Sequence, residues 1–519
     1  MAHPWLRATA GFVCCAFLLA GCSKQANSDS NQPSATASPS PSAAASNVTS
    51  ATTLTIGYTP GSGFNPYVAN SNLVAQNAGL LFENLVELTP SMSLEYRIAQ
   101  SIQSTGNMVL IQIRSGCTFA DGTAITADDV AASLQAAKSS EMYSARFANV
   151  TKIETQGTGV QITLAQPDSM FAYLCDVPVL KASETASTQP TASGRYTYGE
   201  SDTLVRNSHC TFAENGPEVI NLTQVTSYDE MVSGLLMGSL NVYAVSPTAE
   251  STSNISSVSE YYKTNNLIFL GINASPDGDK SPILTTAAGR ILLSQMANRR
   301  QLAEKGYYSR AYPATGIINN YYDCVASKHT ILAEDELDAE HAAADFLALG
   351  YTKDPTSGYY QDQKGNRLTL RLTVYTGNTY KRYAASLLQE QFAAKGLDIE
   401  LDEVSDFTAY SEKIATGDFD LYIGEVKLYN NMDMSPFFAG GQASYGIVQN
   451  EALLTAYTAF KADQSAAGAF EEAFAAEMPL VPLLWRNGSV AHTRNISGLS
   501  CSLSNVFYSL EGLTFEQTS

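Results

Sequence analysis

The cysteine at position 22 has the most readily predicted chemistry in the sequence. It ends a Leu-Ala-Gly-Cys run at residues 19–22, directly after an uncharged and largely apolar stretch at residues 8–20. That stretch is shorter than the roughly 20 apolar residues that span a bilayer, but it fits the core of a secretory signal peptide. In a lipoprotein signal of this kind, the cysteine thiol accepts a diacylglyceryl group before a peptidase cuts the chain. We therefore expect residues 1–21 to be a lipoprotein signal peptide and Cys22 to be a lipidation site.

The segment that follows is suited to holding a folded body away from a membrane. Residues 22–52 are rich in Ser, Ala and Pro and contain no aromatic residue. Such a composition cannot bury enough apolar surface to offset chain entropy, so we expect a disordered tether with a reach on the order of 30 Å. Two or more acyl chains on Cys22 would make the anchoring stable. The alternative is an ordinary secreted protein with a chance cysteine at this position.

Familiar catalytic and metal-binding motifs are missing from the sequence. It has no G-x-S-x-G, S-x-x-K or H-E-x-x-H motif and no Gly-Lys dipeptide for a phosphate loop. The histidines after residue 21 have no partner at metal-ligand spacing: His209, His329, His341 and His492. The acid pairs 128–129 and 471–472 are interpreted as solvated helix faces. We expect no enzymatic activity, no metal and no cofactor, although an exported hydrolase assembled from scattered residues stays open as an alternative.

Charge and cysteine content narrow the class of protein further. The chain carries 30 basic and 50 acidic residues, a net charge of −20, which argues against nucleic acid as a partner. The odd number of cysteines left for the folded body allows at most two disulfides, and we expect partial or no pairing: Cys117, Cys175, Cys210, Cys324 and Cys501. Roughly 470 residues follow the tether, enough for two or three domains.

Strand and helix patterns alternate along that body. Period-two alternation predicts strands at residues 53–58, 108–114, 160–164, 241–245, 368–375, 398–404 and 419–426. Helical periodicity predicts helices at residues 228–240, 285–298, 335–349, 379–395, 405–416 and 451–476. A further helix begins after Thr126, whose hydroxyl is placed to accept from the third helical amide. These patterns predict a mixed α/β protein of two lobes.

One stretch resembles the signature of a known family. Residues 110–133 contain an arginine and then Phe119, Asp121-Gly122, Thr126-Ala127 and Asp129-Val130 at the family's spacing. This sequence pattern resembles that of the family 5 extracellular solute-binding proteins, the peptide- and nickel-binding components of ABC importers. The main departure is an isoleucine, Ile125, where the family has leucine.

Other segments resemble the same family in the same order. Residues 61–66 look like the first loop of dipeptide-binding members, and residues 193–196 resemble a Gly-Pro-Tyr turn with Arg195 replacing proline. The resemblance covers about residues 54–515 and implies a two-lobed periplasmic-binding-protein-like fold of type II with a ligand cleft between its lobes. It implies lobe 1 at residues 53–268 and 486–519, and an inserted lobe 2 at residues 269–485. Ligand would be enclosed by hinge closure.

The resemblance also points to candidate ligand-binding residues. Peptide binders of the family place an aspartate in the loop that aligns with residues 425–437, where this chain has Asn430. An amide lacks the charge that makes an ammonium contact strong, so Asp433 or Glu425 could take over, or the ligand has no free α-amine. The candidates are Ser62, Gly63, Phe64, Lys427, Tyr429, Asn430, Asn431, Asp433 and Tyr445.

Four of the candidates in the second lobe have a simpler alternative. Asp433 could be a turn-forming residue, Lys427 could merely pair with Glu425, and Tyr429 and Tyr445 could have core or surface roles. With the resemblance, we expect a monomeric, lipid-anchored subunit at the extracytoplasmic face of the cell membrane. It would capture oligopeptides or dipeptides and deliver them to ABC permease subunits. A peptide-sensing receptor on the same fold and a metal-chelate binder are the nearest rivals.

Overall fold

The computed structural model describes residues 53–245, 258–275, 280–325 and 331–516. The expected signal peptide (1–21), Cys22 and the expected tether (22–52) lie outside the described residues. Within the described ranges, no helix is both long enough and apolar enough to cross a membrane. The mixed α/β class expected from the sequence is confirmed.

The N-terminal part of the described chain is built mainly from short strands. Its elements are β1 (Leu54–Tyr58), α1 (Asn72–Leu81), β2 (Val86–Leu88), β3 (Leu94–Tyr96), β4 (Ala99–Thr105), β5 (Met108–Ile113), α2 (Ala127–Ser139), β6 (Val150–Gln156), β7 (Gly159–Leu164), β8 (Tyr196–Tyr198), β9 (Thr203–Arg206), β10 (Val219–Gln224), α3 (Tyr228–Met237) and β11 (Val242–Val245). Three sheets arise from them: the two-stranded β2-β3, an antiparallel one in the order β4-β5-β7-β6, and one half of a larger sheet in the order β11-β1-β10-β9-β8.

The segment that resembles the family signature forms the N-terminus of α2. Thr126 Oγ1 accepts from the Asp129 amide at 3.4 Å, and Asp129 Oδ2 accepts from the Thr126 amide at 2.9 Å. This capping box satisfies two helix-end donors. Phe119 is buried in the core, and Ser133 Oγ donates to the carbonyl of Leu180 at 3.2 Å. The segment that resembles the signature therefore forms the capped start of α2 and contributes buried side chains to lobe 1.

The C-terminal part has longer helices around a parallel sheet. Its elements are β12 (Val258–Ile272), α4 (Pro282–Thr285), α5 (Ala287–Met296), α6 (Arg299–Gln301), β13 (Ala311–Pro313), α7 (Ala339–Ala348), β14 (Thr352–Lys353), β15 (Tyr360–Gln361), β16 (Thr369–Tyr375), α8 (Thr379–Ala394), β17 (Asp398–Val404), α9 (Phe407–Thr416), β18 (Leu421–Lys427), α10 (Glu451–Ala462), α11 (Ala467–Glu477), β19 (Leu480–His492), β20 (Ile496–Ser497) and β21 (Thr514–Phe515). Strands β16, β17 and β18 are parallel, so their carboxyl ends share one edge of the sheet.

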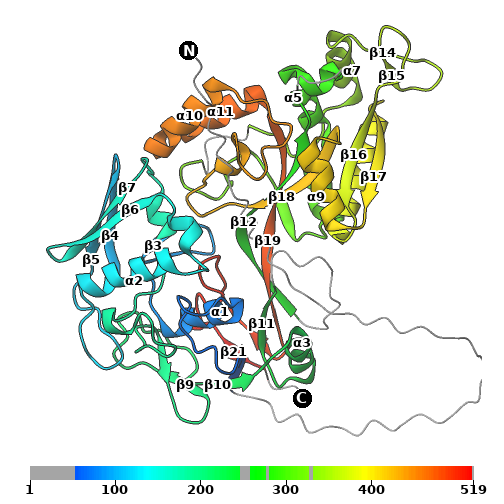
Figure 1. Cartoon of the computed structure of the whole chain (residues 1–519). Coiled ribbons are helices and arrows are strands. Elements are labelled where there is room, and N and C mark those ends of the chain that lie inside the picture. The colour runs from blue at the N-terminus through cyan, green and yellow to red at the C-terminus, as the bar shows by residue number, and fades with distance from the viewer. Residues whose placement is uncertain (1–52, 246–257, 276–279, 326–330, 517–519) are drawn as a thin grey trace, which may run out of the picture. The chain divides into compact units, whose positions relative to one another are not determined.

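Two long strands connect the two parts of the molecule (Figure 1). β12 and β19 run antiparallel along most of their length, and β19 also pairs with β11 of lobe 1 while β12 pairs with β18 of lobe 2. Their register shifts between Lys263 and Asn266, which leaves Thr264 and Asn265 in a bulge. A bulge bends the strand that carries it and increases its twist. We call this place the crossing.

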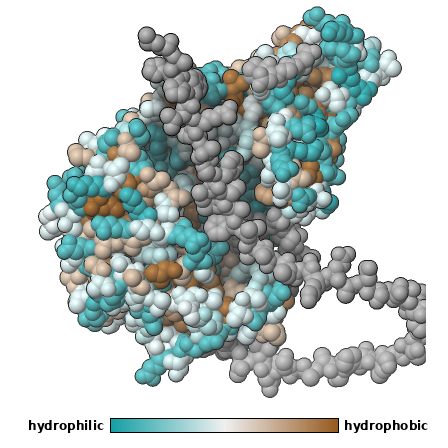
Figure 2. All heavy atoms as spheres, in the orientation of Figure 1, coloured by the Kyte–Doolittle hydropathy of each residue, from teal (hydrophilic) through white to brown (hydrophobic). Residues whose placement is uncertain are grey.

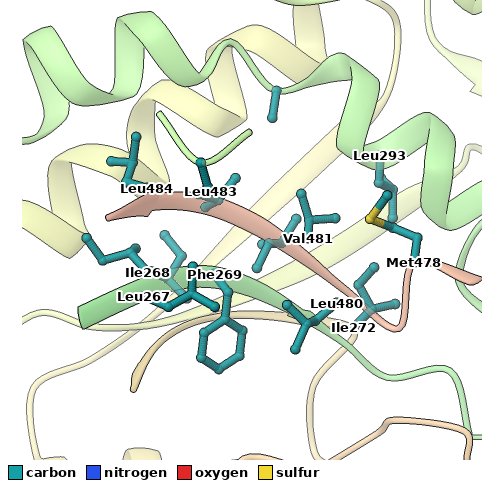
Figure 3. Close-up of a cluster of buried hydrophobic side chains, with 14 of the residues drawn as sticks. Leu267, Ile268, Phe269, Ile272, Leu293, Met478, Leu480, Val481, Leu483 and Leu484 are labelled. Carbon is teal, nitrogen blue, oxygen red and sulfur yellow. The ribbon is translucent and has the colours of Figure 1, made fainter. Parts of the chain in front are cut away.

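The core of lobe 2 forms around the same two strands (Figure 3). Leu267, Phe269 and Ile272 of β12 pack near Leu480 and Val481 of β19, and all five side chains are at most 2% exposed. A second core lies in lobe 1. The lobe 2 core also contains four side chains from the N-terminal part: Leu88, Met92, Met170 and Tyr173. The two parts are thus in apolar contact as well as joined by strands.

Two expectations for lobe 2 need correction. Residues 451–476 were expected to form one helix, but α10 ends at Ala462 and α11 begins at Ala467. Asp463 ends α10 and its carboxylate accepts from the Ser465 amide at 2.9 Å, which starts a separate turn. Glu471 was interpreted as part of a solvated face, yet it is 3% exposed and accepts from two backbone amides, Ile317 at 2.8 Å and Ile318 at 2.7 Å. Burial raises the pKa of Glu471 to about 7.

All five cysteines of the described body are free thiols. The face in Figure 2 is mostly hydrophilic, with small and separate hydrophobic patches, as expected for an acidic chain.

Candidate functional site

The crossing is unusually polar for a buried segment. Thr264, Asn265 and Asn266 are each 1% exposed, so their side chains need internal partners. Thr264 Oγ1 donates to the carbonyl of Arg486 at 2.5 Å. Asn265 Nδ2 donates to Tyr322 Oη at 2.8 Å. These bonds hold the bulge in one conformation at the point where both long strands pass between the lobes.

The crossing also receives amide groups from lobe 2. Asn319 Nδ2 donates to the carbonyl of Thr264 and to Asn265 Oδ1, both at 2.9 Å. Asn265 Nδ2 donates in turn to Asn430 Oδ1 at 3.1 Å. The structure thus places Asn430, one of the candidates from the sequence, in direct contact with the bulge.

Asn430 contacts lobe 1 as well. Its Nδ2 donates to Asp176 Oδ2 at 3.0 Å, and Ser504 Oγ donates to the same oxygen at 3.1 Å. The other Asp176 oxygen pairs with Arg146. Burial raises the pKa of the Asp176 carboxyl, and the charge of Arg146 opposes that effect. Asp176 is therefore a hydrogen-bonded, charge-paired group whose acceptors are already in use.

Arg146 is fixed by two neighbours. It pairs with Asp176, and its guanidinium lies 4.6 Å from the centroid of the Tyr143 ring, a cation–π geometry. Its side chain is 17% exposed. Arg146 comes from a short 3-10 turn, Ser144–Phe147, so no helical periodicity marks it in the sequence.

Glu425 lies on the lobe 2 side of the crossing and is paired twice. Lys381 Nζ is 3.2 Å from Glu425 Oε2, and Arg486 Nη1 is 3.3 Å from Glu425 Oε1. Asn266 Nδ2 donates to Glu425 Oε1 at 3.3 Å. Although burial alone raises the pKa of Glu425, the charges of Lys381 and then Arg486 bring it below its usual value. Glu425 is therefore an ionised and compensated carboxylate.

Lys427 ends β18 two residues after Glu425, so both side chains lie on the same face of the sheet. Within the described parts of the chain, no carboxylate lies within ion-pair distance of Lys427; Glu425 pairs with Lys381 and Arg486 instead. The side chain has solvent access, yet protein atoms surround it closely enough that desolvation, and then the charge of Arg146, lower the pKa of its ammonium. We call the group Arg146, Asp176, Glu425, Lys427 and Asn430 the crossing site.

The remaining candidates of the 425–437 loop have different surroundings. Tyr429 is 39% exposed next to the crossing site. Asn431 is buried, and its Nδ2 donates to Asp168 Oδ2 at 2.6 Å. Asp433 accepts from the Ser435 amide at 2.9 Å and from Tyr457 Oη at 2.8 Å. These contacts favour the turn-forming interpretation of Asp433.

Four candidates lie apart from the crossing site. Tyr445 adjoins the amino end of β18, where the Ala274 amide donates to the Gly446 carbonyl at 2.9 Å. That end is about 20 Å along the strand from Lys427. In lobe 1, Phe64 is 8% exposed and stacks on Tyr58 with centroids 6.0 Å apart. The structure places this loop, which includes Ser62 and Gly63, against the carbonyl of Thr188.

A second polar contact joins the lobes beside the crossing. Lys461 Nζ of α10 lies 2.7 Å from Asp168 Oδ1 and donates to the Asn431 carbonyl at 3.0 Å. Gln464 Nε2 donates to the Ser169 carbonyl at 2.7 Å. We call this group, Asp168, Ser169, Asn431, Lys461 and Gln464, the side contact.

Sequence reasoning missed several residues of both groups. Asp168 and Asp176 flank a short 3-10 turn, Phe171–Leu174, and Arg146 sits in another. Such turns carry no hydrophobic period, and a lone charged residue in them looks like any surface residue. A usable signal was the polar run at residues 264–266 directly before the apolar residues 267–270 of the same strand, because a buried polar run needs partners.

Comparisons with known proteins bear on the family and the fold of this chain. Residues 93–446 match the family model described as bacterial extracellular solute-binding proteins, family 5 middle. A glutathione-binding protein, GsiB, of Shigella flexneri is 32% identical over 145 residues, which is 26% of this chain. The chain thus spans only 27% of the length of that curated relative.

Two solved structures share the fold. One is MppA, a periplasmic murein tripeptide binding protein in its unliganded open form, with a TM-score of 0.69 and 16% identity over 89% of this chain and 97% of that one. The other is a nickel ABC transporter protein from Bacillus halodurans, with a TM-score of 0.71 and 15% identity over 89% of this chain and 99% of that one. At such identities the likeness concerns the fold alone.

Proposed function

The chain belongs to the bacterial extracellular solute-binding proteins of family 5, and we propose from this that it captures short peptides and hands them to an ABC permease. The family is one of transport proteins that bind a ligand and work with a permease. The proposal that the ligand is a peptide is more specific than the family. It is supported by similarity to a glutathione-binding protein and to the fold of a murein tripeptide binding protein.

The observation that carries the proposal is the chemistry of the crossing. Asparagine side chains of β12 and of lobe 2 meet there in a chain of hydrogen bonds, in which Asn265 and Asn319 are buried and Asn430 is partly exposed. Peptide backbones present alternating N–H and C=O groups, and the Asn430 amide has one further donor hydrogen and one further acceptor lone pair with which to bind them irrespective of the peptide's sequence. If the lobes close by rotating about the connecting strands, residues at the crossing move least, so the crossing would form the base of the closing cleft.

The anchored state is part of the same proposal. Lipid on Cys22 and a tether at residues 22–52 would keep the binding protein at the extracytoplasmic face of the membrane, close to its permease. We propose that the protein acts there as a monomer, with lobe 1 at residues 53–268 and 486–519 and lobe 2 at residues 269–485.

A thermal-shift screen tests the proposed ligand class. The purified protein is heated with mixed tripeptides, amino-terminally capped tripeptides, glutathione, sugars, and nickel with L-histidine. A ligand at a hundred times its Kd stabilises the fold by about 2.7 kcal/mol, which is a readable shift. Stabilisation by peptides supports the proposal.

The other outcomes separate the alternatives. Stabilisation by nickel–histidine or sugars alone would keep the importer function and reject the peptide assignment. Loss of the peptide effect on capping would show that the free α-amine is bound. Cleavage of the peptides during the assay, followed by mass spectrometry, would instead support an exported hydrolase.

A further inference from the structure

We propose that the ligand of this protein carries an acidic group, and that Lys427, supported by Arg146, binds that group at the crossing site. The inference rests on the proposed function, because it takes the crossing site to be where ligand is held. It adds the charge of the ligand, which neither the fold nor the family specifies.

Both carboxylates of the crossing site are already paired. Asp176 pairs with Arg146, and Glu425 lies within 3.3 Å of Lys381 Nζ and of Arg486 Nη1. Lys427 ends β18 opposite Asn266 of β12, and among the described residues no ion pair joins it to a carboxylate. In a chain whose net charge is −20, a cation without a carboxylate partner at this place calls for a specific reason.

Lys427 is open to solvent, so a ligand can reach it. Three residues later Asn430 bonds to Asp176, whose oxygens already accept from Arg146, Asn430 and Ser504. Desolvation, and then the like charge of Arg146, lower the pKa of the Lys427 ammonium. An anion placed beside Lys427 would offset that like charge. The ligand is the group that can bring this anion.

Lys427 sits at one edge of the parallel strands of lobe 2. It lies at the carboxyl end of a parallel sheet, the usual place for ligands in open α/β structures. The N-terminus of the 16-residue helix α8 lies on the same side and brings Lys381 in its first turn, with no acidic residue there. Helix N-termini carry a partial positive charge, so cations in the first turn are unfavourable unless an anion is near. Glu425 supplies one such anion, and the ligand would supply another.

Binding of matched acidic and neutral probes tests the inference. Isothermal titration of the full protein with Ala-Glu-Ala, Ala-Gln-Ala, glutarate and glutaramide compares pairs that differ in charge. We expect each acid to bind at least tenfold more tightly than its neutral partner. Lys427→Met should abolish that preference by weakening the acid at least tenfold, and Lys427→Arg should keep it within about threefold.

A second lysine provides the matched control. Lys152 lies on β6, is 62% exposed and pairs with Glu154 on the surface of lobe 1. Lys152→Met removes the same charge from the whole protein, so its acid preference should equal that of wild type. Circular dichroism of each variant confirms that it is folded.

The outcomes distinguish this inference from the proposed function. If Ala-Gln-Ala binds as tightly as Ala-Glu-Ala and Lys427→Met changes neither, the inference is wrong while peptide capture stands. If glutarate binds through Lys427 but no peptide binds, the inference stands and the peptide assignment is wrong. Failure of every acidic probe to bind at millimolar concentration contradicts the inference.

Discussion

Two lysines of lobe 2 approach two aspartates of one short segment of lobe 1, and their charges are balanced differently. In the side contact, Lys461 pairs with Asp168 at 2.7 Å. In the crossing site, Asp176 is already paired with Arg146, which leaves Lys427 near it without an ion pair among the described residues. The comparison suggests that the balanced pair holds the lobes together, whereas the unbalanced lysine is kept for a ligand.

The largest effect expected from this contrast is on stability. Lys461→Met removes the ion-pair partner of Asp168, a carboxylate whose side chain is 3% exposed and which keeps its hydrogen bond from Asn431 Nδ2. Breaking a buried pair in this way leaves an uncompensated charge, so the free energy of unfolding in urea should fall by about 3 kcal/mol. Lys427→Met should lower it by less than about 1 kcal/mol, because it takes away a cation that has no ion pair within the described part of the chain. If Lys427→Met lowers the free energy of unfolding more than Lys461→Met does, Lys427 and not Lys461 is the lysine that holds the lobes together.

Glu87 of lobe 1 is a buried acid whose charged form, among the described residues, has no ion pair to balance it as Lys461 balances Asp168. Burial, and then the neighbouring Glu83, raise the pKa of Glu87 to about 7, well above an ordinary glutamate. The folded state therefore keeps its proton between pH 4.5 and 7 while the unfolded state loses it. The contribution of this group to stability is full below that window and is lost as the pH rises through it.

Glu87→Gln removes this titration and keeps an acceptor for Asn505 Nδ2, which lies 3.0 Å from Glu87 Oε1. The variant should match wild type at pH 5 and exceed its free energy of unfolding by about 2 kcal/mol at pH 8. Urea unfolding at both pH values measures the difference. A constant difference at all pH values would show that Glu87 does not titrate in this range.

The pH dependence of ligand binding sharpens the assignment of Lys427. Its pKa is lowered, so the ammonium is present at low pH and is lost as the pH rises through that lowered value. The affinity for Ala-Glu-Ala should therefore fall above it, by about tenfold for each pH unit at most. Lys427→Arg should stay flat to pH 9.5, since a guanidinium keeps its proton. Equal pH profiles for the wild type and Lys427→Arg would show that Lys427 does not bind the acidic group of the ligand.

The smallest effect is expected at Asp433. Its carboxylate serves the Ser435 amide and the Tyr457 hydroxyl, so Asp433→Ala should lower the free energy of unfolding by about 1–2 kcal/mol. The affinity for peptides should change less than threefold, as measured by titration calorimetry. A tenfold loss of affinity with unchanged stability would place Asp433 at the ligand after all.

Patterns of adjacent residues were sufficient for much of the fold. The capping box at Thr126 and Asp129, strand β17 at Asp398–Val404 and helix α8 from Thr379 all follow from local rules of side-chain hydrogen bonding and periodicity. Such features depend on neighbours within a few positions, so they can be derived from one sequence. The resemblance then supplied the family, which the comparisons confirm.

The crossing site was only half predictable for the same reason. Lys427 and Asn430 were found because they lie in one loop that aligns with the family. Arg146 and Asp176 lie more than 250 residues before Lys427, and it is the packing of the two lobes around the paired strands β12 and β19 that brings them together. The burial of Glu471 was missed because its partners, the amides of Ile317 and Ile318, belong to another segment.

The most direct test of the central claim follows the Lys427 ammonium itself. Lysines labelled by reductive ¹³C-methylation keep their charge, and Lys427→Arg identifies the Lys427 signal in the NMR spectrum. We predict that the pKa of Lys427 lies below that of an ordinary lysine in the free protein, and that it rises when Ala-Glu-Ala binds but not when Ala-Gln-Ala does. An unchanged pKa in the presence of bound Ala-Glu-Ala would contradict the claim that this lysine receives the acidic group of the ligand.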